Sequence, residues 1–443
     1  MDLTHKILAQ EAPKVLTEYP IVNIRELLAD SSLFLTILHL KSSRQNMRIF
    51  IIHNYYQDPG GEDGVFHQEA QLLGKTHTVK TYSKKNKKGL KGLRDFLFYP
   101  YNIFNTRQVL REIAAFKPDV VHIHNLHYTF GPQLIQAIKK RGYPLVFTLH
   151  NFRLLCPSAT LFHKGKVYKK SLKNGYPFQA VKDKVLDNSW FKTCWTAWTY
   201  YLHRQLGTFL KVDKYIVLSE LTKRLLQGPP THIPDQQISI KPNFIPQKYA
   251  AIGTEKSTPR GSDFLYIGRL TQEKGILKLM HHIKGTNLKL NIAGDGPLKG
   301  EITHLCKKHP DQFHYLGFQS KVQIAHLLKT CTALVFPSVW YEGMPLTSLE
   351  ALSAGTPIIG SKLGVLQEMI KPGQTGLLFD PHSKNDTLNT LNKWLSLTEA
   401  SRSIIGSNCL NEYREHYSEA INLQKLERIY KDVLKANKTK THE

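Results

Sequence analysis

The chain has 443 residues, of which 41% are hydrophobic, a length and composition that suit two globular domains and exclude a disordered protein. Its 60 lysines and arginines outnumber 35 aspartates and glutamates, and the net charge of +25 favours an anionic partner: phosphorylated substrate, acidic lipid headgroups or nucleic acid. The five scattered cysteines form no CxxC pair, which indicates neither a disulfide framework nor a zinc site, and no apolar run reaches the roughly 20 residues that span a bilayer.

The first 46 residues do not share the pattern of the rest. Residues 32–40 are apolar but too short to span a membrane, and acids precede them where a signal peptide carries positive charge. A regular α/β pattern begins with MRIFIIHNYY at Met47. Met47 is therefore either the true start, or residues 1–46 are an appendage of the first domain.

Apolar, β-prone runs then alternate with stretches of helical periodicity. This alternation predicts βαβ units and a parallel, doubly wound sheet. The strands expected in the first domain are residues 48–53, 77–82, 120–124, 145–149, 215–218 and 238–240. Because ligands of such sheets bind beyond the carboxyl ends of the strands, the residues that follow each strand are the candidates for chemistry.

Three of these strand ends carry candidate residues. Gly60 and Gly61 follow the first strand and let the backbone approach a ligand closely, although an ordinary turn is the simpler interpretation. His122 and His124 share a face of the third strand, but no acid or cysteine at ligand spacing accompanies them, so we expect them to line a cleft and not to bind metal. His150 ends the fourth strand, where substrates meet the sheet; the alternative is a structural histidine.

Residues 189–206, SWFKTCWTAWTYYLHRQL, place most of their aromatic side chains at helical spacing. We predict that this aromatic face packs in the core. The alternative is an interfacial helix that touches lipid headgroups, where Trp and Tyr are common. Flanking cations such as Lys182 and Lys192 are compatible with this alternative.

Polar sequence after PNFIP, residues 242–246, predicts the linker to a second βαβ series. Gly268, Arg269 and Lys274 follow its first strand, residues 264–267, and the two cations suit a diphosphate. Gly294 makes a tight turn after the next strand.

The densest signal is WYEGMPLTSLEALSAGTPIIG, residues 340–360. A helix is expected to start at Pro345, and its free amides suit a phosphate. The candidates for phosphate binding at this start are Gly343, Met344, Pro345, Leu346 and Thr347, all of which except Pro345 carry a backbone N–H. Glu342 before the helix and Glu350 inside it are placed to bind a diol each, although either acid alone is more simply a complement to the helix dipole.

Two glutamates with seven residues between them, AGTPII, and the GRLxxEKG of residues 268–275 resemble glycosyltransferase family 4, retaining enzymes of the GT-B fold that use nucleotide sugars. TLHNFRLLCPSATLFHKGK resembles the bacterial members that build capsule, exopolysaccharide or O-antigen chains. The resemblance covers residues 47–435. It implies two α/β, Rossmann-like domains facing each other across a cleft: an acceptor domain at 47–245, a donor domain at 246–420, and a helix at 421–443 that crosses back.

The resemblance also implies roles. The glycine-rich loop lies near the donor diphosphate, and His150 supports the donor sugar or the developing charge. Arg269 and Lys274 hold the diphosphate, while Glu342 positions the sugar and Glu350 the ribose. Because the sequence has no DxD motif, we expect no metal and no other cofactor.

The expected partners are a nucleotide-sugar donor, a glycan or polyprenyl-diphosphate-linked acceptor, and the anionic inner face of the cytoplasmic membrane; nucleic acid is not expected. The alternatives are a nucleotide-sugar epimerase or a phosphorylase of the same fold, and a non-catalytic basic protein. The last would explain the charge, but not the glycines and acids at strand ends.

Overall fold

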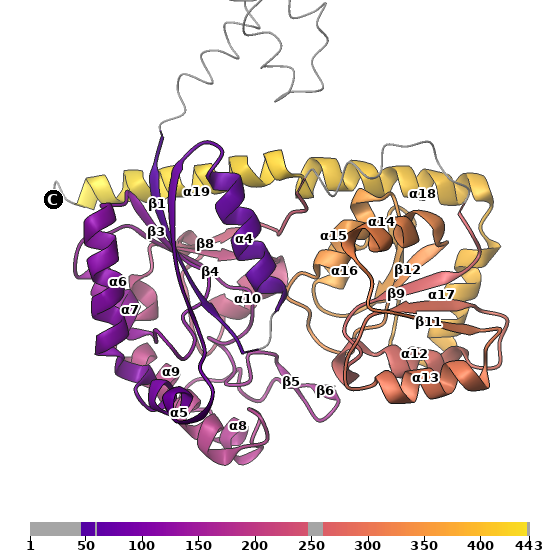
Figure 1. The fold of residues 1–443 in the computed structure, drawn as a ribbon, viewed down its shortest axis with the longest axis horizontal. Coiled ribbons are helices and arrows are strands. Elements are labelled where there is room, and N and C mark those ends of the chain that lie inside the picture. The colour runs from indigo at the N-terminus through magenta and orange to yellow at the C-terminus, as the bar shows by residue number, and fades with distance from the viewer. Residues whose placement is uncertain (1–45, 58–59, 247–259, 441–443) are drawn as a thin grey trace, which may run out of the picture.

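A computed structural model describes residues 46–57, 60–246 and 260–440. Figure 1 shows two lobes side by side, each built on one parallel sheet, with the C-terminal helices running along one side of both. The sheets have the strand orders β2-β1-β3-β4-β7-β8 and β11-β10-β9-β12-β13-β14. This confirms the predicted fold class, α/β with two doubly wound, Rossmann-like domains.

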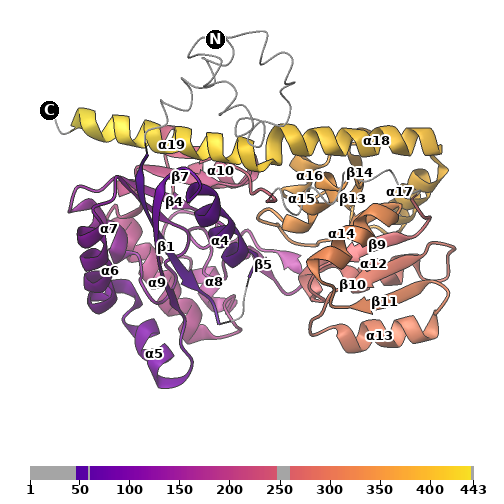
Figure 2. The same ribbon diagram turned by 45° about the horizontal axis from the view of Figure 1, so that its top comes forward.

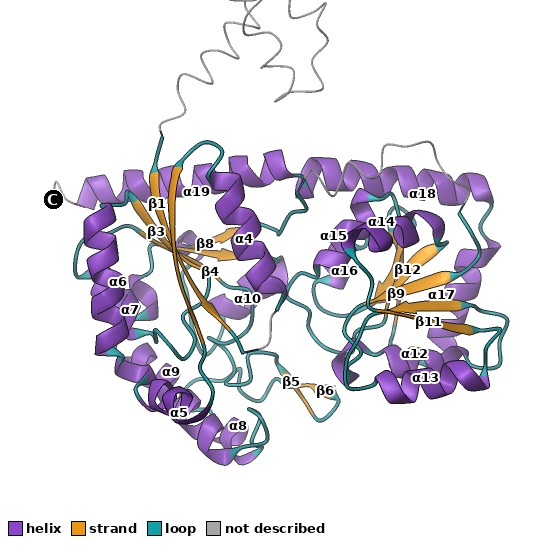
Figure 3. Cartoon of the chain, in the orientation of Figure 1, coloured by secondary structure: helices purple, strands orange, loops and turns teal. Residues whose placement is uncertain are grey.

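The first sheet consists of β1 (Arg48–Tyr55), β2 (Thr78–Lys85), β3 (Val120–Ile123), β4 (Leu145–Thr148), β7 (Lys214–Val217) and β8 (Ile238–Ile240). Every residue of β3 and β4 is buried, as expected for central strands whose two faces are both covered. The helices of this domain are α4 (Gly61–Leu73), α5 (Gly89–Leu97), α6 (Ile103–Phe116), α7 (Gln133–Lys139), α8 (Phe178–Lys182), α9 (Trp190–Gln205) and α10 (Glu220–Gln227). A small hairpin, β5 (Phe162–His163) and β6 (Lys166–Val167), reaches toward the second domain (Figure 3).

The second sheet consists of β9 (Phe264–Ile267), β10 (Leu290–Ala293), β11 (Phe313–Gly317), β12 (Ala333–Phe336), β13 (Ile358–Ser361) and β14 (Gly376–Phe379). Its helices are α12 (Ile276–Ile283), α13 (Lys299–Lys308), α14 (Lys321–Thr330), α15 (Leu346–Ser353), α16 (Leu366–Met369), α17 (Lys384–Ser396) and α18 (Glu399–Glu412). Helix α15 begins one residue after Pro345, which is its N-cap.

The last helix, α19 (Glu419–Lys440), leaves the second domain and lies along the first, as Figure 2 shows. Its apolar side chains Leu426, Tyr430 and Val433 are buried in one cluster with Ile49 and Ile51 of β1. The final helix therefore supplies part of the hydrophobic core of the first domain.

Helix α9 corrects one prediction. Its buried face carries Thr193, Thr196, Ala197, Thr199, Tyr200 and His203, whereas Trp190 is 56% exposed, Phe191 47% and Trp198 40%. The predicted core face is therefore wrong. The small threonine and alanine side chains let α9 pack closely against the rest of the first domain. Hydrogen bonds fix this packing: the Tyr99 hydroxyl donates to the Tyr200 hydroxyl at 2.7 Å, and His203 Nε2 lies 2.9 Å from the Pro100 carbonyl oxygen.

Candidate active site

A cleft of about 1380 Å³ lies between the domains, at the carboxyl ends of the strands. The first domain contributes Gly60, Gly61 and His150, and the second contributes Gly268 and Arg269. The remaining predicted residues that line it are Lys274, Glu342, Gly343, Met344, Pro345, Leu346 and Thr347. The fold thus brings together predicted site residues that lie up to 287 positions apart in the printed sequence, from Gly60 to Thr347.

The domains meet closely where Gly343 faces the end of β4. A Cβ atom on Gly343 would lie 2.8 Å from the carbonyl oxygen of His150. Since such an approach excludes any side chain, glycine here lets the loop before α15 reach His150.

Lys274 and Glu342 form an ion pair on the second-domain side of the cleft. The Lys274 ammonium lies 2.8 Å and 2.9 Å from the two Glu342 carboxylate oxygens. Ser338 donates a further hydrogen bond to the same carboxylate, and the ammonium lies 5.3 Å from the centre of the Trp340 ring. From the sequence we expect separate roles for Lys274 and Glu342, but in the structure their charges compensate each other.

The loop that carries Lys274 is held in place by Gly275. This glycine has φ of +72°, and a Cβ atom there would lie 2.0 Å from the Pro337 carbonyl oxygen. No other residue fits that position, so the turn places Lys274 against the strand end of β12.

Arg269 presents a different environment. Its side chain is 66% exposed, and its nearest ion-pair partner, Glu273, is 3.9 Å away. A guanidinium held this loosely keeps its donors available for a ligand in the cleft.

Gly294 and Glu350 are outside the lining of the cleft. Gly294 packs against the loop that follows β9, because a Cβ atom on it would lie 1.9 Å from the Gly268 carbonyl oxygen. Glu350 forms an ion pair with Lys321, and Lys321 itself lines the cleft.

His150 belongs to a chain of buried polar groups. Its Nε2 atom lies 3.0 Å from Nδ1 of His124, whose Nε2 lies 3.3 Å from the Glu69 carboxylate. Glu69 in turn accepts a hydrogen bond of 2.7 Å from the Lys241 ammonium. Burial, together with the neighbouring imidazole of His124, holds the pKa of His150 well below its ordinary value, so His150 is neutral at physiological pH.

Glu69 is the acid that the sequence spacing did not reveal beside His122 and His124. It comes from α4, and it lies 3.5 Å from His122 Nδ1. Together the three side chains offer a possible ligand set for a metal. However, the Lys241 ammonium already compensates the carboxylate, and His122 has partners at both ring nitrogens, Tyr430 at 2.7 Å and Thr148 at 2.7 Å, so we assign a structural role to this group.

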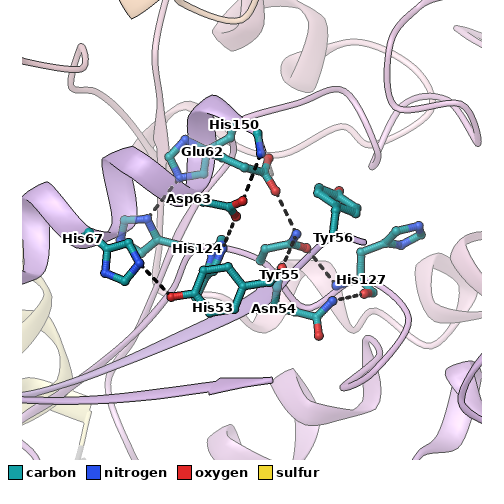
Figure 4. A network of polar contacts seen from close by, with 12 residues as sticks. His53, Asn54, Tyr55, Tyr56, Glu62, Asp63, His67, His124, His127 and His150 are labelled. Carbon is teal, nitrogen blue, oxygen red and sulfur yellow. Dashed lines mark hydrogen bonds and ion pairs between the residues drawn. The ribbon is translucent and has the colours of Figure 1, made fainter. Parts of the chain in front are cut away.

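Two consecutive acids at the start of α4 face different partners (Figure 4). Asp63 lies 2.7 Å from His53 Nε2 and accepts a hydrogen bond from the Gly60 amide. Glu62 instead accepts hydrogen bonds from the side-chain amides of Asn125, at 2.8 Å, and Asn151, at 3.2 Å. Glu62 lines the cleft, and sequence reasoning missed it although it directly follows the glycine pair.

Comparisons with known proteins agree with this architecture. The chain matches the model of Glycosyltransferase Family 4 over residues 76–248 and that of Glycosyl transferases group 1 over residues 254–408. Together the two family models match most of the chain.

Similar curated proteins include an α-monoglucosyldiacylglycerol synthase of Acholeplasma laidlawii, 26% identical over 372 residues, which are 80% of this chain and 83% of that protein. An uncharacterized glycosyltransferase of Methanocaldococcus jannaschii is 32% identical over 176 residues, which are 37% of this chain and only 44% of that protein.

Solved structures share the fold. Sucrose-phosphate synthase from Thermosynechococcus elongatus has a TM-score of 0.64 at 18% identity, over 88% of this chain and 100% of that one. Anabaena HepE in complex with UDP and glucose has a TM-score of 0.57 at 16% identity, over 87% of this chain and 99% of that one.

Proposed function

Because this chain belongs to the glycosyltransferases described by the Family 4 and group 1 models and has their GT-B fold, we propose that it moves a hexose from a nucleotide-diphosphate sugar to a glycan or lipid-linked acceptor, with retention at the anomeric carbon. The observation that carries the proposal is the convergence of Arg269, Lys274 and the start of α15 on one interdomain cleft. The complex of Anabaena HepE with UDP and glucose supports a nucleotide sugar as donor. Synthesis of a bacterial surface polysaccharide is the setting that we propose.

The proposed chemistry centres on the leaving group. As the bond between the anomeric carbon and the diphosphate oxygen breaks, negative charge develops on the diphosphate, and a site must stabilise it at that moment. Arg269, Lys274 and the amides at the start of α15 supply positive charge and donors there. An acceptor hydroxyl then attacks from the face that the diphosphate leaves, and its proton passes to the departing phosphate oxygen.

Glu342 has a second task in this proposal. Its carboxylate faces the cleft while paired with Lys274, so it can accept hydrogen bonds from donor-sugar hydroxyls without an uncompensated charge. Glu350, one turn into α15, is assigned to the ribose. Since protein cations and amides already act on the leaving group, we propose that transfer needs no divalent metal.

A thermal-shift screen of nucleotide sugars tests the donor assignment. A donor that binds the native state raises the melting temperature by mass action, and we expect uridine diphosphate sugars to do so. Glu350→Ala should weaken binding of the free nucleotide, whereas Glu342→Ala should leave nucleotide binding nearly intact and abolish transfer. If no nucleotide sugar stabilises the protein, the proposed function fails.

We also propose peripheral association with an anionic membrane, at the inner face of the cytoplasmic membrane. No helix in the described ranges is long and apolar enough to cross a bilayer. Large apolar side chains are exposed on α5, α8 and α9, including Leu90 at 85%, Phe178 at 75% and Trp190 at 56%. The cations Lys88 and Lys192 flank this surface, which suits insertion of apolar side chains among anionic headgroups.

Vesicle sedimentation tests the association. Binding to vesicles that contain phosphatidylglycerol should exceed binding to neutral vesicles and weaken with salt, because charges are screened over about 10 Å at 0.1 M. Trp190→Ser should weaken binding. The matched control is Ile404→Ser, which removes a side chain 63% exposed on α18 of the second domain and should change nothing. Equal binding to both vesicle types at every salt concentration would contradict the proposal.

A further inference from the structure

We propose that the Glu62 carboxylate anchors a hydroxyl of the acceptor next to the hydroxyl that attacks the donor sugar, and so forms a subsite for an uncharged sugar or polyol unit. The inference rests on the proposed glycosyl transfer and adds to it the chemical class of the acceptor group that enters the cleft. It is carried by the position of Glu62, by the way its carboxylate is held, and by its lack of an ion-pair partner.

Glu62 is the second residue of α4 and projects from the first domain into the cleft, where His150 and Asn151 also line the wall. The donor-side residues Arg269, Lys274 and Glu342 belong to the second domain and line the same cleft. A group bound to Glu62 therefore reaches the donor sugar from the first domain. The backbone beside it is open, because a Cβ atom on Gly61 would meet nothing within 4 Å.

Side-chain amides orient the Glu62 carboxylate from two strand ends. Asn125 follows β3, and its side-chain amide donates to one carboxylate oxygen of Glu62. The same amide group also donates to the Asn54 carbonyl oxygen at 2.9 Å, and its oxygen accepts from the backbone N–H of His127 at 2.8 Å, which fixes its orientation. Asn151 follows β4 and donates to the other oxygen; it accepts from the Arg153 amide at 3.0 Å. Amides from two strand ends thus hold one carboxylate in a defined direction.

Glu62 differs from the other acids around it. Glu342 is paired with Lys274, Asp63 contacts His53, and Glu69 is paired with Lys241. Within the part of the chain that the structure describes, no ion pair involves Glu62. An ionised carboxylate accepts about four hydrogen bonds. Two are taken by the amides, which leaves lone pairs for hydroxyl donors in the cleft.

The charge of the site selects the ligand. Burial raises the pKa of Glu62 to about 7, and the neighbouring Asp63 acts in the same direction, while the two amides and the Arg153 guanidinium oppose them. The Tyr56 phenol also lies within the range of its charge. A phosphate or carboxylate bound directly to this carboxylate would face a charge of the same sign, whereas a hydroxyl donates to it. The subsite therefore suits an uncharged part of the acceptor.

Glu62 takes a neighbouring hydroxyl and not the attacking one, because a hydroxyl has one proton to donate. In the proposed transfer that proton passes from the attacking oxygen to the departing phosphate oxygen as the new glycosidic bond forms. A carboxylate that held the same proton would compete with this step. Glu62 is thus expected to act on acceptor binding, whereas a general base would act on the rate of the bound complex.

The experiment compares Glu62→Gln with Asp63→Asn, two adjacent substitutions that each remove one carboxylate charge. The donor is the nucleotide sugar that stabilises the wild-type protein most, and the acceptors are methyl glycosides of common hexoses. We expect Glu62→Gln to raise the acceptor KM by about 10- to 100-fold, the range for a lost charged hydrogen bond. The rate at saturating acceptor and the donor-induced thermal shift should stay near those of wild type. Asp63→Asn should lower the melting temperature, and at a pH well above 7, where Glu62 is ionised in either protein, it should leave the acceptor KM unchanged.

The pH profile is a second readout. For the wild type, kcat/KM for the acceptor should rise as pH increases through about 7, because ionised Glu62 accepts hydrogen bonds from hydroxyls. Glu62→Gln should lose this rise. An unchanged acceptor KM, or a large loss of kcat with an unchanged KM, would overturn the assignment. So would the absence of binding of every methyl glycoside to the wild-type protein with the nucleotide diphosphate present. Normal donor binding in the same experiments separates these outcomes from failure of the proposed function.

Discussion

Replacing Lys274 by methionine leaves the Glu342 carboxylate, which is only 4% exposed, without its cation. Two unit charges 2.8 Å apart attract by about 6 kcal/mol at an effective dielectric constant of about 20. Desolvation of both charges offsets part of this attraction. An unpaired buried charge usually costs about 3–5 kcal/mol, and we expect Lys274→Met to lower the free energy of unfolding by that amount.

The double variant Lys274→Met, Glu342→Gln removes both charges. The amide oxygen of the new glutamine can still accept the hydrogen bond that the Ser338 hydroxyl donates to Glu342 in the wild type. We expect it to recover most of the lost stability, because replacing both members of a buried pair is often nearly neutral. Urea unfolding should be followed by circular dichroism. Tryptophan fluorescence is unsuitable because Lys274 lies over the Trp340 ring.

Activity separates the structural and chemical roles of the pair. The double variant should melt near the wild type, yet its transfer rate should remain about 30- to 1000-fold lower, since about 2–4 kcal/mol of transition-state stabilisation is lost. Additive effects of the two single substitutions on stability, with coupling below about 0.5 kcal/mol, would refute the assignment of a buried, energetically coupled pair.

Three further changes to the protein and one to the assay conditions test other parts of the proposal. Arg269→Ala should weaken binding of the free nucleotide diphosphate by about tenfold or more without lowering the melting temperature. EDTA should not reduce the activity of the wild-type protein. Activity that EDTA abolishes and Mg²⁺ restores would contradict the metal-free proposal. A chain that starts at Met47 should keep the activity and melting temperature of the full chain, and a collapse in either would show that residues 1–46 contribute to the catalytic domain. Burial alone would raise the pKa of Glu69, but the Lys241 ammonium and the imidazoles of His124 and His122 outweigh it and hold this pKa well below its ordinary value. Ionised Glu69 therefore stabilises the folded state above about pH 4.3, and this stabilisation is lost as pH falls toward the lower pKa of the native state. Glu69→Gln should lower the melting temperature at pH 7 and flatten its decline in acid; an unchanged melting profile would contradict a stabilising pair.

The α/β pattern was readable from the sequence because the central strands of a doubly wound sheet, such as β3 and β4, are apolar and buried on both faces, and because candidate residues were sought where strands end. That rule led to His150, Arg269 and the start of α15. It did not show which groups pair across the fold. Lys274 and Glu342 are 68 positions apart, and their contact depends on how the loop at Gly275 packs against β12.

Helix α9 shows a second kind of limit. Periodicity identifies a face of a helix, but the choice of the buried face depends on the surface that receives it. Here Tyr99 and the Pro100 carbonyl offer hydrogen-bond partners to Tyr200 and His203, so the face that carries these two residues turns inward. Trp190 and Trp198 turn outward. The sequence could have suggested Glu62, since it directly follows Gly60 and Gly61. That no ion pair involves it, among the residues that the structure describes, emerges only from the fold.

The position of α19 has a consequence for how the protein is made. The first sheet is complete once residue 240 has been synthesised, yet Leu426 and Tyr430, which close one side of its core, belong to the final helix. At about 5–20 residues per second, a ribosome needs roughly 9 to 36 s to proceed from β8 to the start of α19. Throughout that interval His122 lacks the Tyr430 hydroxyl and Lys241 lacks the side-chain amide oxygen of Asn422. The first domain of the nascent chain therefore keeps an open apolar face until α19 has been made.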